Sequence, residues 1–318
     1  MEPAEVEHAF DPFFTTRPED RMKLGYIPPM TKGLTDDAGY VIPLVEMLEE
    51  VGIEIVWTVE HVIMADNYEP LYPYSDDGRA PTSPDTLMPD PLEWLAFAAA
   101  RTDRMNLGTA VIIASQHSAA ILAKRVATLD ALSGGRVRLG VGLGWQREEY
   151  EAIGVPYRDR GRRLDETLEA MRVLWKDDLA TYQGKHVSFE NVHMDTKPAN
   201  GVSVPILIGG SSDFAARRAG RLGDGWYPYV ISPEEFEKGI ATLGQAARDA
   251  NRDPEQVELS IWPASYDFTK TFDTGFVKAY TELGAERLVI SQVEAGTTDI
   301  GAQRDFIRRY QDEVLSKL

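Results

Sequence analysis

The 318-residue chain contains no cysteine. Without thiols it can form no disulfide, no thiolate zinc site, no iron–sulfur cluster and no cysteine nucleophile. Basic side chains are also scarce, because 33 Lys and Arg stand against 51 Asp and Glu, for a net charge of -18. That field opposes binding to nucleic acid, which requires a basic surface, and docking on anionic lipid. We therefore expect neither a nucleic-acid partner nor a membrane partner.

Other features are missing as well. No apolar run reaches the roughly 18 residues that a membrane span requires. The opening MEPAEVEHAF is acidic and mixed and lacks the basic start and apolar stretch of a signal peptide, so a cytoplasmic protein is the default expectation. The five histidines show neither H-x-H nor H-E-x-x-H spacing, and no G-x-S-x-G elbow occurs. The sequence therefore predicts no metal site and gives little support to a hydrolase.

What the sequence does contain is a regular alternation of short apolar runs and longer segments with helical periodicity. This order favours a parallel sheet, and eight strand-then-helix units close a (β/α)8 TIM barrel. A doubly wound open sheet is the alternative. The expected strands lie at 23–27, 53–59, 106–113, 136–142, 205–208, 225–230, 257–262 and 287–291. The expected helices lie at 37–50, 91–101, 119–132, 158–175, 213–221, 233–250, 275–283 and 300–314.

We expect one barrel domain over residues 22–318, preceded by an N-terminal extension at 1–21. Two segments do not fit the simple repeating unit. Residues 67–90 contain five prolines and little periodicity, which is typical of a lid or binding loop. Residues 181–193 are predicted to form a hairpin, inserted between the fourth and fifth barrel strands.

In such a barrel the active site is built at the C-terminal ends of the strands and in the loops that follow. Gly209, Gly210, Ser211 and Ser212 connect the fifth barrel strand to its helix. Glycines allow a ligand to approach the backbone, and the N–H groups and dipole of a helix N-terminus favour an anion. A phosphate cup is one interpretation. An ordinary strand-to-helix turn with a serine cap is the other.

A second glycine-rich segment, Gly140-Val141-Gly142-Leu143-Gly144, follows the fourth strand. It fails as a dinucleotide fingerprint, because the third glycine of G-x-G-x-x-G would fall on Trp145 or Arg147. These glycines are instead interpreted as letting a flat ring lie close to the backbone at the barrel mouth.

Glu60 and His61 follow the second strand and could form an acid/base pair. A histidine with its ordinary pKa of about 6.5 exchanges a proton readily at neutral pH. A surface pair at a strand end is the alternative. His117, near the start of a helix, is interpreted as capping or solvated, and His186 and His193 as structural residues of the hairpin.

Several of these segments, taken together and in order, resemble the signatures of the luciferase-like monooxygenase superfamily. They are LDALSGGR at 129–136, LGVGLGW at 139–145 with Glu149, IGGS at 208–211, and LGDGW at 222–226. Glu60 and His61 stand where many coenzyme F420-dependent members carry an acidic residue and a histidine. Its sequence most resembles that of the F420-dependent oxidoreductase branch.

The resemblance implies a (β/α)8 barrel with an insertion, often dimeric, so that a homodimer is expected. It also implies a cofactor, F420 or alternatively FMN, in the barrel mouth. The positions that match cofactor-binding residues of the family are Gly209, Gly210 and Ser211 for the phosphate, Ala110 and Val111 at a bulge that often carries a non-prolyl cis peptide, and Gly142, Gly144 and Trp226 bordering the cofactor.

One departure from the family affects the choice of substrate. Sugar-phosphate dehydrogenases of the superfamily carry a proton-donating glutamate soon after the fourth-strand glycines, and this chain has Trp145 there. The departure argues against a sugar phosphate and leaves His61, with Glu60, as the expected catalytic acid. Aromatic residues expected to meet a small organic substrate are Tyr26, Trp145, Tyr227 and Trp262.

The sequence thus predicts hydride transfer between a deazaflavin and an unidentified organic substrate. Two alternatives stay open. The first is an FMN-dependent monooxygenase that uses reduced flavin and dioxygen. The second is a barrel without catalytic activity that binds a cofactor or ligand.

Overall fold

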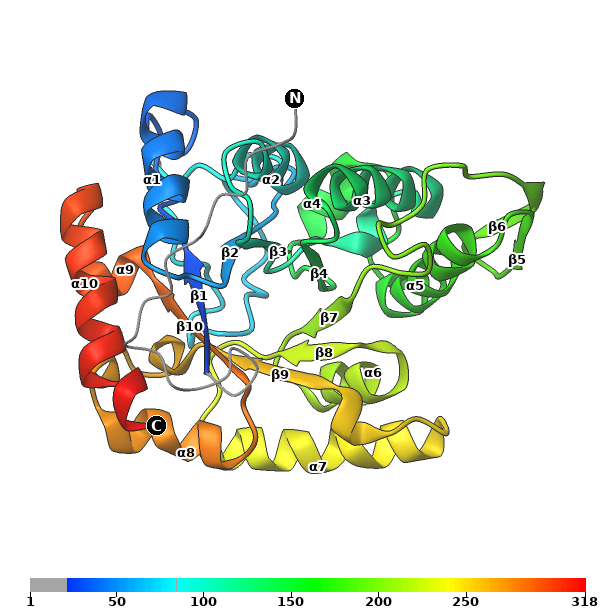
Figure 1. The fold of residues 1–318 in the computed structure, drawn as a ribbon. Helices are drawn as coiled ribbons and strands as arrows, with labels where there is room; N and C mark the ends of the chain where they lie inside the picture. The colour runs from blue at the N-terminus through cyan, green and yellow to red at the C-terminus, as the bar shows by residue number, and fades with distance from the viewer. Residues whose placement is uncertain (1–21, 84) are drawn as a thin grey trace, which may run out of the picture.

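The computed structural model describes residues 22–83 and 85–318, so the expected extension at 1–21 lies outside the described residues. Eight parallel strands form a closed barrel in the order β1-β10-β9-β8-β7-β4-β3-β2 (Figure 1). The ring closes because β1 pairs with both β2 and β10, which confirms the (β/α)8 barrel over the open sheet. The barrel strands are β1 (Lys23–Ile27), β2 (Ile55–Thr58), β3 (Asn106–Thr109), β4 (Val137–Val141), β7 (Ile206–Gly209), β8 (Gly225–Tyr227), β9 (Glu258–Ile261) and β10 (Arg287–Ser291).

Helices surround the barrel, and an antiparallel hairpin projects away from it at the right of Figure 1. The hairpin strands β5 (Ala180–Gln183) and β6 (Ser188–Val192) confirm the predicted insertion. The α-helices are α1 (Ala38–Glu50), α2 (Pro91–Ala99), α3 (Ala119–Ser133), α4 (Arg147–Ala152), α5 (Arg160–Lys176), α6 (Asp213–Leu222), α7 (Pro233–Asp249), α8 (Thr274–Glu282), α9 (Gln292–Ala295) and α10 (Ile300–Glu313).

Local sequence signals set where these helices begin and end. Ser232 and Glu235 form a capping box at the start of α7, with Pro233 as its first residue, where a missing N–H costs nothing. α3 ends at Gly134, whose φ of 72° is a left-handed conformation that glycine adopts without a steric penalty. The helix expected at 119–132 therefore ends one residue later, at Ser133, directly before this glycine.

Two barrel strands end earlier than expected. β3 stops at Thr109, and the peptide bond between Ala110 and Val111 is cis, as the family resemblance implied. Ile112 then forms an isolated bridge with Val141 of β4. β8 stops at Tyr227 because the next residue, Pro228, has no N–H to continue the ladder.

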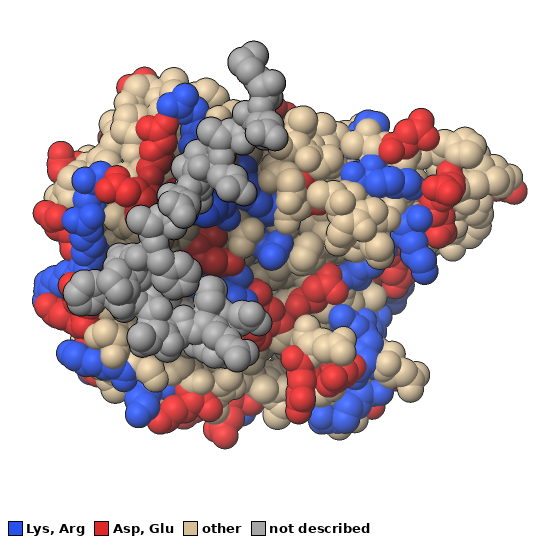
Figure 2. All heavy atoms as spheres, in the orientation of Figure 1, with Lys and Arg blue, Asp and Glu red and all other residues tan. Residues whose placement is uncertain are grey.

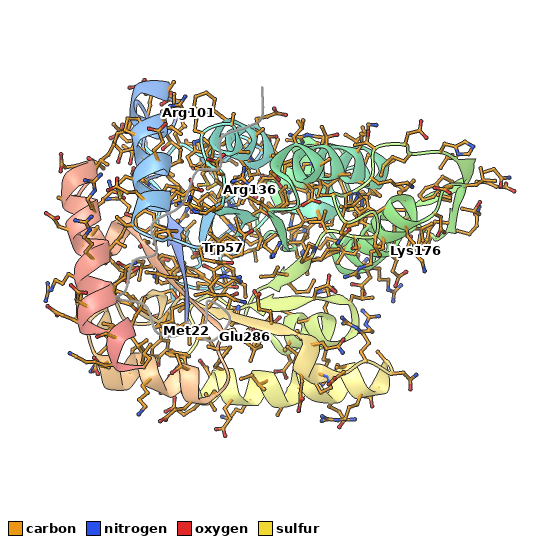
Figure 3. All side chains as sticks on the ribbon, viewed as in Figure 1. Met22, Trp57, Arg101, Arg136, Lys176 and Glu286 are labelled. Carbon is orange, nitrogen blue, oxygen red and sulfur yellow. The ribbon has the colours of Figure 1, made fainter. Side chains whose placement is uncertain are left out.

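Alternation along the strands divides the apolar side chains into two layers. One layer fills the space between strands and helices and includes Tyr26 and Trp226. The other fills the barrel lumen and includes Trp57, Tyr227 and Trp262. Trp57 lies among the strands, whereas Arg101 and Lys176 lie at the periphery (Figure 3).

Two glycines make room for the large indole in the lumen. A Cβ added at Gly25 would lie 2.6 Å from an atom of the Trp57 ring, and one added at Gly108 would lie 2.2 Å from another. Both distances are far inside van der Waals contact. The fully buried Trp57 therefore requires small residues on the strands to either side of it.

A charged layer closes the N-terminal end of the lumen. Arg287, only 1% exposed, donates from Nε to Glu54 at 2.7 Å and pairs through Nη1 with Glu258. Lys23 lies 3.6 Å from the same Glu258. These residues stand at or just before the first positions of their strands, so the lumen is packed and closed at this end. In TIM barrels the active site is built at the opposite end.

The surface carries both signs of charge. Figure 2 shows acidic and basic side chains interspersed over the face that is drawn, without a continuous basic field. None of the helices in the described part of the chain has the length and apolar character needed to cross a bilayer.

Candidate functional site

The C-terminal ends of β2, β3 and β4 carry two carboxylate–imidazole pairs. Nδ1 of His61 lies 3.1 Å from Oε2 of Glu149, and Nε2 of His117 lies 2.9 Å from Oε1 of Glu60. Glu60 and His61, which the sequence suggested as a pair, each have a partner from another loop. Successive side chains of an extended segment point in opposite directions, so neighbours in sequence do not become partners here.

Glu149 is the fully buried member of the first pair. It lies on α4, the short helix that follows β4, and its Oε1 accepts a hydrogen bond from the backbone N–H of Val62 at 2.6 Å. This short distance is typical of a charge-assisted bond to a carboxylate. Glu149 thus holds both the backbone and the side chain of the segment after β2.

Glu60 links the second strand to the third. Its Oε2 accepts from the backbone N–H of Ile113 at 2.6 Å, just beyond the cis peptide. Because its Oε1 meets His117, this histidine is neither the helix cap nor the solvated residue expected from the sequence. The Glu60–His117 pair instead fixes the loop that follows β3.

The glycine–serine turn lies between β7 and α6. Ser212 is the N-cap of α6, since its hydroxyl accepts from the N–H of Ala215 at 3.3 Å. The hydroxyl of Ser211 accepts from the N–H of Tyr229 at 3.0 Å and donates to the carbonyl of the same residue. Gly210 has a φ of 102°, which only glycine adopts readily. The turn therefore has an ordinary serine cap and also the open, glycine-lined backbone that an anion site needs.

The segment predicted as a lid lies over this mouth. The Tyr74 hydroxyl is 3.7 Å from the position a Cβ on Gly210 would take, and the Tyr74 and Tyr229 rings are 4.9 Å apart. Burial raises the pKa of Tyr74, and hydrogen bonding to Ser211 opposes that rise. Tyr72 of the same segment packs edge-on against Trp145 at 5.4 Å. In this structure Tyr74 thus packs beside the turn and Tyr72 packs beside Trp145.

The glycines after β4 and β7 accommodate the segment that carries the cis peptide. A Cβ on Gly142 or on Gly209 would lie 2.5 Å from a methyl group of Val111. A Cβ on Gly144 would lie 3.0 Å from Ile113. The room that these glycines leave is thus occupied by protein side chains, and any flat ring would lie against Val111 rather than in place of it.

The expected aromatic residues fall into two groups. Tyr227 and Trp262 belong to the lumen cluster, and the Trp145 ring packs edge-on against His61 at 5.8 Å. These three lie at the mouth. The other two do not reach it, because their positions on the strands point outward into the helical layer.

The first of these, Tyr26, donates its hydroxyl to Gln303 of α10 at 2.6 Å. The second, Trp226, stacks on Phe236 of α7 at 5.4 Å. Tyr26 is thus placed away from any substrate at the mouth. Trp226 supports the glycine–serine turn from behind, since its Nε1 donates to the Gly210 carbonyl at 3.0 Å.

Four residues of the mouth were missed as site residues from the sequence: Glu149, Tyr74, Tyr229 and Glu294. In the sequence, Glu149 was noted only as part of the family signature, with no role assigned to it. Glu294 was detectable as the fourth residue of a Ser-x-x-Glu capping box that begins at Ser291. Burial raises the pKa of Glu294 to about 7, although hydrogen bonds from Trp262 and Ser291 oppose the rise.

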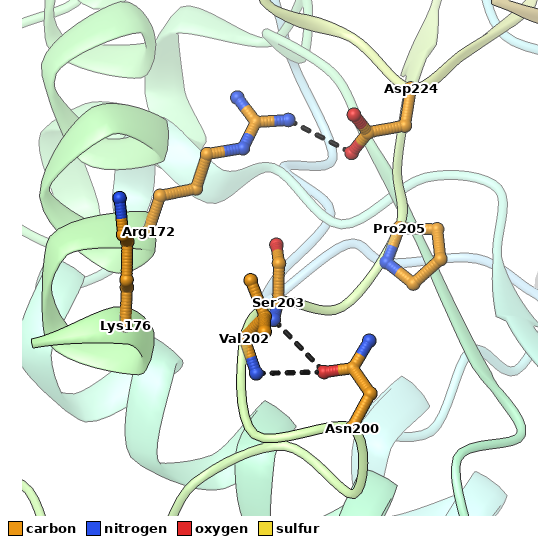
Figure 4. A pocket seen from close by; sticks show the side chains of 7 residues that line it. All are labelled: Arg172, Lys176, Asn200, Val202, Ser203, Pro205 and Asp224. Carbon is orange, nitrogen blue, oxygen red and sulfur yellow. Dashed lines mark hydrogen bonds and ion pairs between the residues drawn. The ribbon is translucent and has the colours of Figure 1, made fainter. Parts of the chain in front are cut away.

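Two cavities lie at opposite ends of the barrel. A cavity beside Pro28, Thr58 and Met88 measures only about 20 Å³. A larger one, of about 330 Å³, lies at the N-terminal ends of β7 and β8, where Arg172 reaches across to Asp224 at 2.9 Å (Figure 4). It is at the opposite end of the barrel from His61 and the glycine–serine turn. Within the described residues no cluster of three or more His, Asp or Glu is arranged to hold a metal ion.

The turn itself fits the phosphate of a nucleotide-like cofactor. Gly210 leaves its backbone exposed to a ligand, and the first N–H groups of α6 have no partner within the helix. Tyr74 is the group that stands against the turn. A phosphate could take this place only if the Tyr74 side chain withdrew.

Comparison with known proteins gives matches over most of the chain. Residues 17–265 match the family model described as luciferase-like monooxygenase. A Mycobacterium tuberculosis protein described as uncharacterised is 30% identical over 261 residues, which covers 80% of this chain and 88% of that protein. The F420-dependent glucose-6-phosphate dehydrogenase of Nocardia farcinica is 36% identical over 210 residues, covering 64% of this chain and 59% of that enzyme.

Solved structures of the same architecture include two with near-complete coverage. The coenzyme F420-dependent tetrahydromethanopterin reductase of Methanopyrus kandleri has a TM-score of 0.70 at 15% identity, covering 93% of this chain and 99% of that one. A monooxygenase of Streptomyces bottropensis has a TM-score of 0.73 at 21% identity with the same coverage. At these identities the likeness shows the shared fold alone.

Proposed function

Because the chain belongs to the luciferase-like monooxygenase family, we propose that it is an F420-dependent oxidoreductase that transfers a hydride between the deazaflavin and an organic substrate. The observation that carries the proposal is the pairing of His61 with the buried Glu149 at the same end of the barrel as the Gly209–Ser212 turn. The proposal assigns proton transfer to His61 and anion binding to the turn, which lie at the same mouth. The F420-dependent relative at 36% identity supports the choice of cofactor.

The residues of the mouth would have the following roles. A bound deazaflavin would supply the hydride chemistry, giving or accepting a hydride at its C5 carbon. Residues of the turn would hold its phosphate, and the backbone around the cis peptide would support its ring. The positions concerned are Gly209, Gly210 and Ser211 for the phosphate, and Ala110, Val111, Gly142 and Gly144 beside the ring.

His61 would move the proton that accompanies the hydride, and the 67–90 loop would exclude water once the ligands are bound. Trp145, Tyr227 and Trp262 would contact the substrate, which suits an apolar or aromatic molecule. Trp145 is nearly buried and carries no acidic group. We therefore propose a substrate other than a sugar phosphate, although the Nocardia relative is a glucose-6-phosphate dehydrogenase.

A titration of the purified protein with F420 and, separately, with FMN tests the proposal. Binding is followed by cofactor fluorescence, at equal protein concentration and ionic strength. We expect micromolar or tighter binding of F420 and weaker binding of FMN. The reverse preference, with oxygen consumption in the presence of reduced FMN, would identify a flavin monooxygenase instead. Binding of neither cofactor would refute the anion-turn assignment, and F420 binding without turnover on a broad substrate panel would indicate a binding protein.

A further inference from the structure

The contacts of Glu149 fix more than the position of His61. A carboxylate offers only acceptors, so the hydrogen between Glu149 Oε2 and His61 Nδ1, which are 3.1 Å apart, must be carried by the ring nitrogen. The other carboxylate oxygen accepts a hydrogen bond from the Val62 N–H at 2.6 Å, so both oxygens of Glu149 are engaged. Neutral His61 is then protonated at Nδ1, with a lone pair at Nε2.

The surroundings leave Nε2 as the atom that can meet a substrate. The His61 side chain is 15% exposed whereas that of Glu149 is fully buried, so the histidine lies on the outer side of the pair. Among the described residues Nε2 has no hydrogen-bond partner, and the nearby Trp145 ring contacts the imidazole edge-on. The ring is thus held at one nitrogen and available at the other.

We propose that Glu149, rather than the adjacent Glu60, is the positioning residue that sets the tautomer of His61, so that Nε2 is the proton-transfer atom of the reaction. The role of Nε2 in turnover rests on the proposed function; the tautomer does not. In the reducing direction the substrate gains a hydride from the reduced cofactor and a proton from Nε2 of the imidazolium. Neutral, Nδ1-protonated His61 remains and is reprotonated from water, and substrate oxidation reverses each step.

The second pair provides an internal comparison. Glu60 is also buried and also accepts one backbone N–H and one imidazole nitrogen, but its histidine is His117, bonded through Nε2. By the same argument His117 carries its hydrogen at Nε2. The two histidines are therefore expected to be opposite tautomers, each fixed by its own glutamate.

Nitrogen-15 NMR of histidine-labelled protein tests the proposal directly. The chain has five histidines, few enough to assign by single substitutions such as His61→Gln and His117→Gln. Two-bond correlation spectra are recorded without cofactor, well above the ordinary histidine pKa of about 6.5. We expect the Nδ1-protonated form for His61 and the Nε2-protonated form for His117. An Nε2-protonated His61 in the unmodified protein would overturn the proposal.

Glu149→Gln and Glu60→Gln form a matched pair of variants. In Glu149→Gln the amide oxygen can still accept from Val62, so that its NH2 group faces Nδ1 and drives His61 to the other tautomer. In Glu60→Gln the His61 signals should not move, while those of His117 change. An unchanged His61 spectrum in folded Glu149→Gln would overturn the proposal. If that variant does not fold, the tautomers observed in the unmodified protein still test the proposal.

Activity provides the second readout, once a substrate is known. Glu149→Gln should lower kcat by at least about a hundredfold, as loss of an orienting carboxylate does elsewhere, with the F420 dissociation constant unchanged within about threefold. A loss confined to KM or to cofactor affinity would contradict a role in proton transfer. If the predicted tautomers are found but F420 does not bind, the proposed function fails while the tautomer assignment stands.

Discussion

The indole nitrogen of Trp226 donates a hydrogen bond to the Gly210 carbonyl at 3.0 Å, which joins the outer helical layer to the glycine–serine turn. The indole ring is pressed against α7, since a Cβ on Gly239 would lie 2.2 Å from it. The geometry of the turn thus depends on a glycine in a helix behind it.

Replacing that glycine with alanine should affect both stability and cofactor binding. Gly239→Ala must displace the ring of Trp226, and overpacking of this kind costs about 1–3 kcal/mol. We also expect weaker F420 binding, because the displaced indole no longer holds the Gly210 carbonyl.

Gly244→Ala is the matched control in the same helix. Its Cβ would meet only the flexible Arg248 side chain at 3.5 Å, and alanine there should stabilise the protein by roughly 0.5–1 kcal/mol. Urea unfolding and cofactor titration measure both effects, and equal behaviour of the two variants would contradict the argument.

The 67–90 loop offers a test of whether the mouth must open for a cofactor to bind. The Tyr74 hydroxyl lies 3.7 Å from the position that a Cβ on Gly210 would take, so it occupies space that a phosphate on the turn would need. Tyr74→Phe removes that hydroxyl and should tighten F420 binding roughly fivefold, which corresponds to about 1 kcal/mol. Tyr72→Phe changes a tyrosine of the same loop that packs against Trp145, and it is the control for a general loosening of the loop. Weaker binding in Tyr74→Phe would instead mean that the hydroxyl contacts the cofactor.

The arrangement of the barrel was predictable because hydrophobic periodicity and helix caps are local properties of the sequence. β1 and β10 have the bounds that the apolar runs indicated, and the stop of α3 at Gly134 follows from a single residue. Hydrophobic periodicity did not predict the early end of β3, because the apolar run continues to Ile113. The cis peptide at Ala110–Val111 was implied by the family resemblance and not by the run itself.

The partners within the site were less predictable, because they depend on the direction of side chains from different loops. Glu60 and His61 were both placed at the mouth, yet each is paired across to another loop. Successive side chains of a strand face opposite sides, and this alternation could have excluded Tyr26 and Trp226 from the site. Their neighbours Ile27 and Tyr227 point into the lumen. The position of Tyr74 beside the turn follows from loop conformation, which a Pro-rich segment does not encode in a simple period.

At the closed end of the barrel, Arg287 should be the most costly charge to remove. Burial alone would raise the pKa of Glu258, but Arg287 and Lys23 hold it below its ordinary value. Arg287→Met leaves Glu54 and Glu258 facing each other without their cation, at a cost of about 3–5 kcal/mol. Lys23→Met removes a 37% exposed partner and should cost less than about 1 kcal/mol. The free energies of unfolding of the two variants, measured in urea, should become more similar at low pH, where the glutamates become protonated. A difference that does not change with pH would contradict the ion-pair explanation.

Glu294 should make the protein less stable as the pH rises. Burial raises its pKa from 4.5 to about 7, so between these values the folded protein holds a proton that the unfolded chain has lost. The stabilisation is then complete below about pH 4.5 and disappears as the pH rises through about 7, and it amounts to about 3 kcal/mol at about 1.4 kcal/mol per pH unit.

Glu294→Gln isolates this contribution. The amide oxygen can still accept from Trp262 and Ser291, and the NH2 group faces Thr271, whose hydroxyl is 3.3 Å from Oε1. We expect the urea midpoint of the unmodified protein to fall between pH 5.5 and 8.5 by more than that of Glu294→Gln, because the amide does not titrate. Parallel pH profiles in the two proteins would show that Glu294 is ionised throughout this range, and the three donors on its Oε2 would then be the reason.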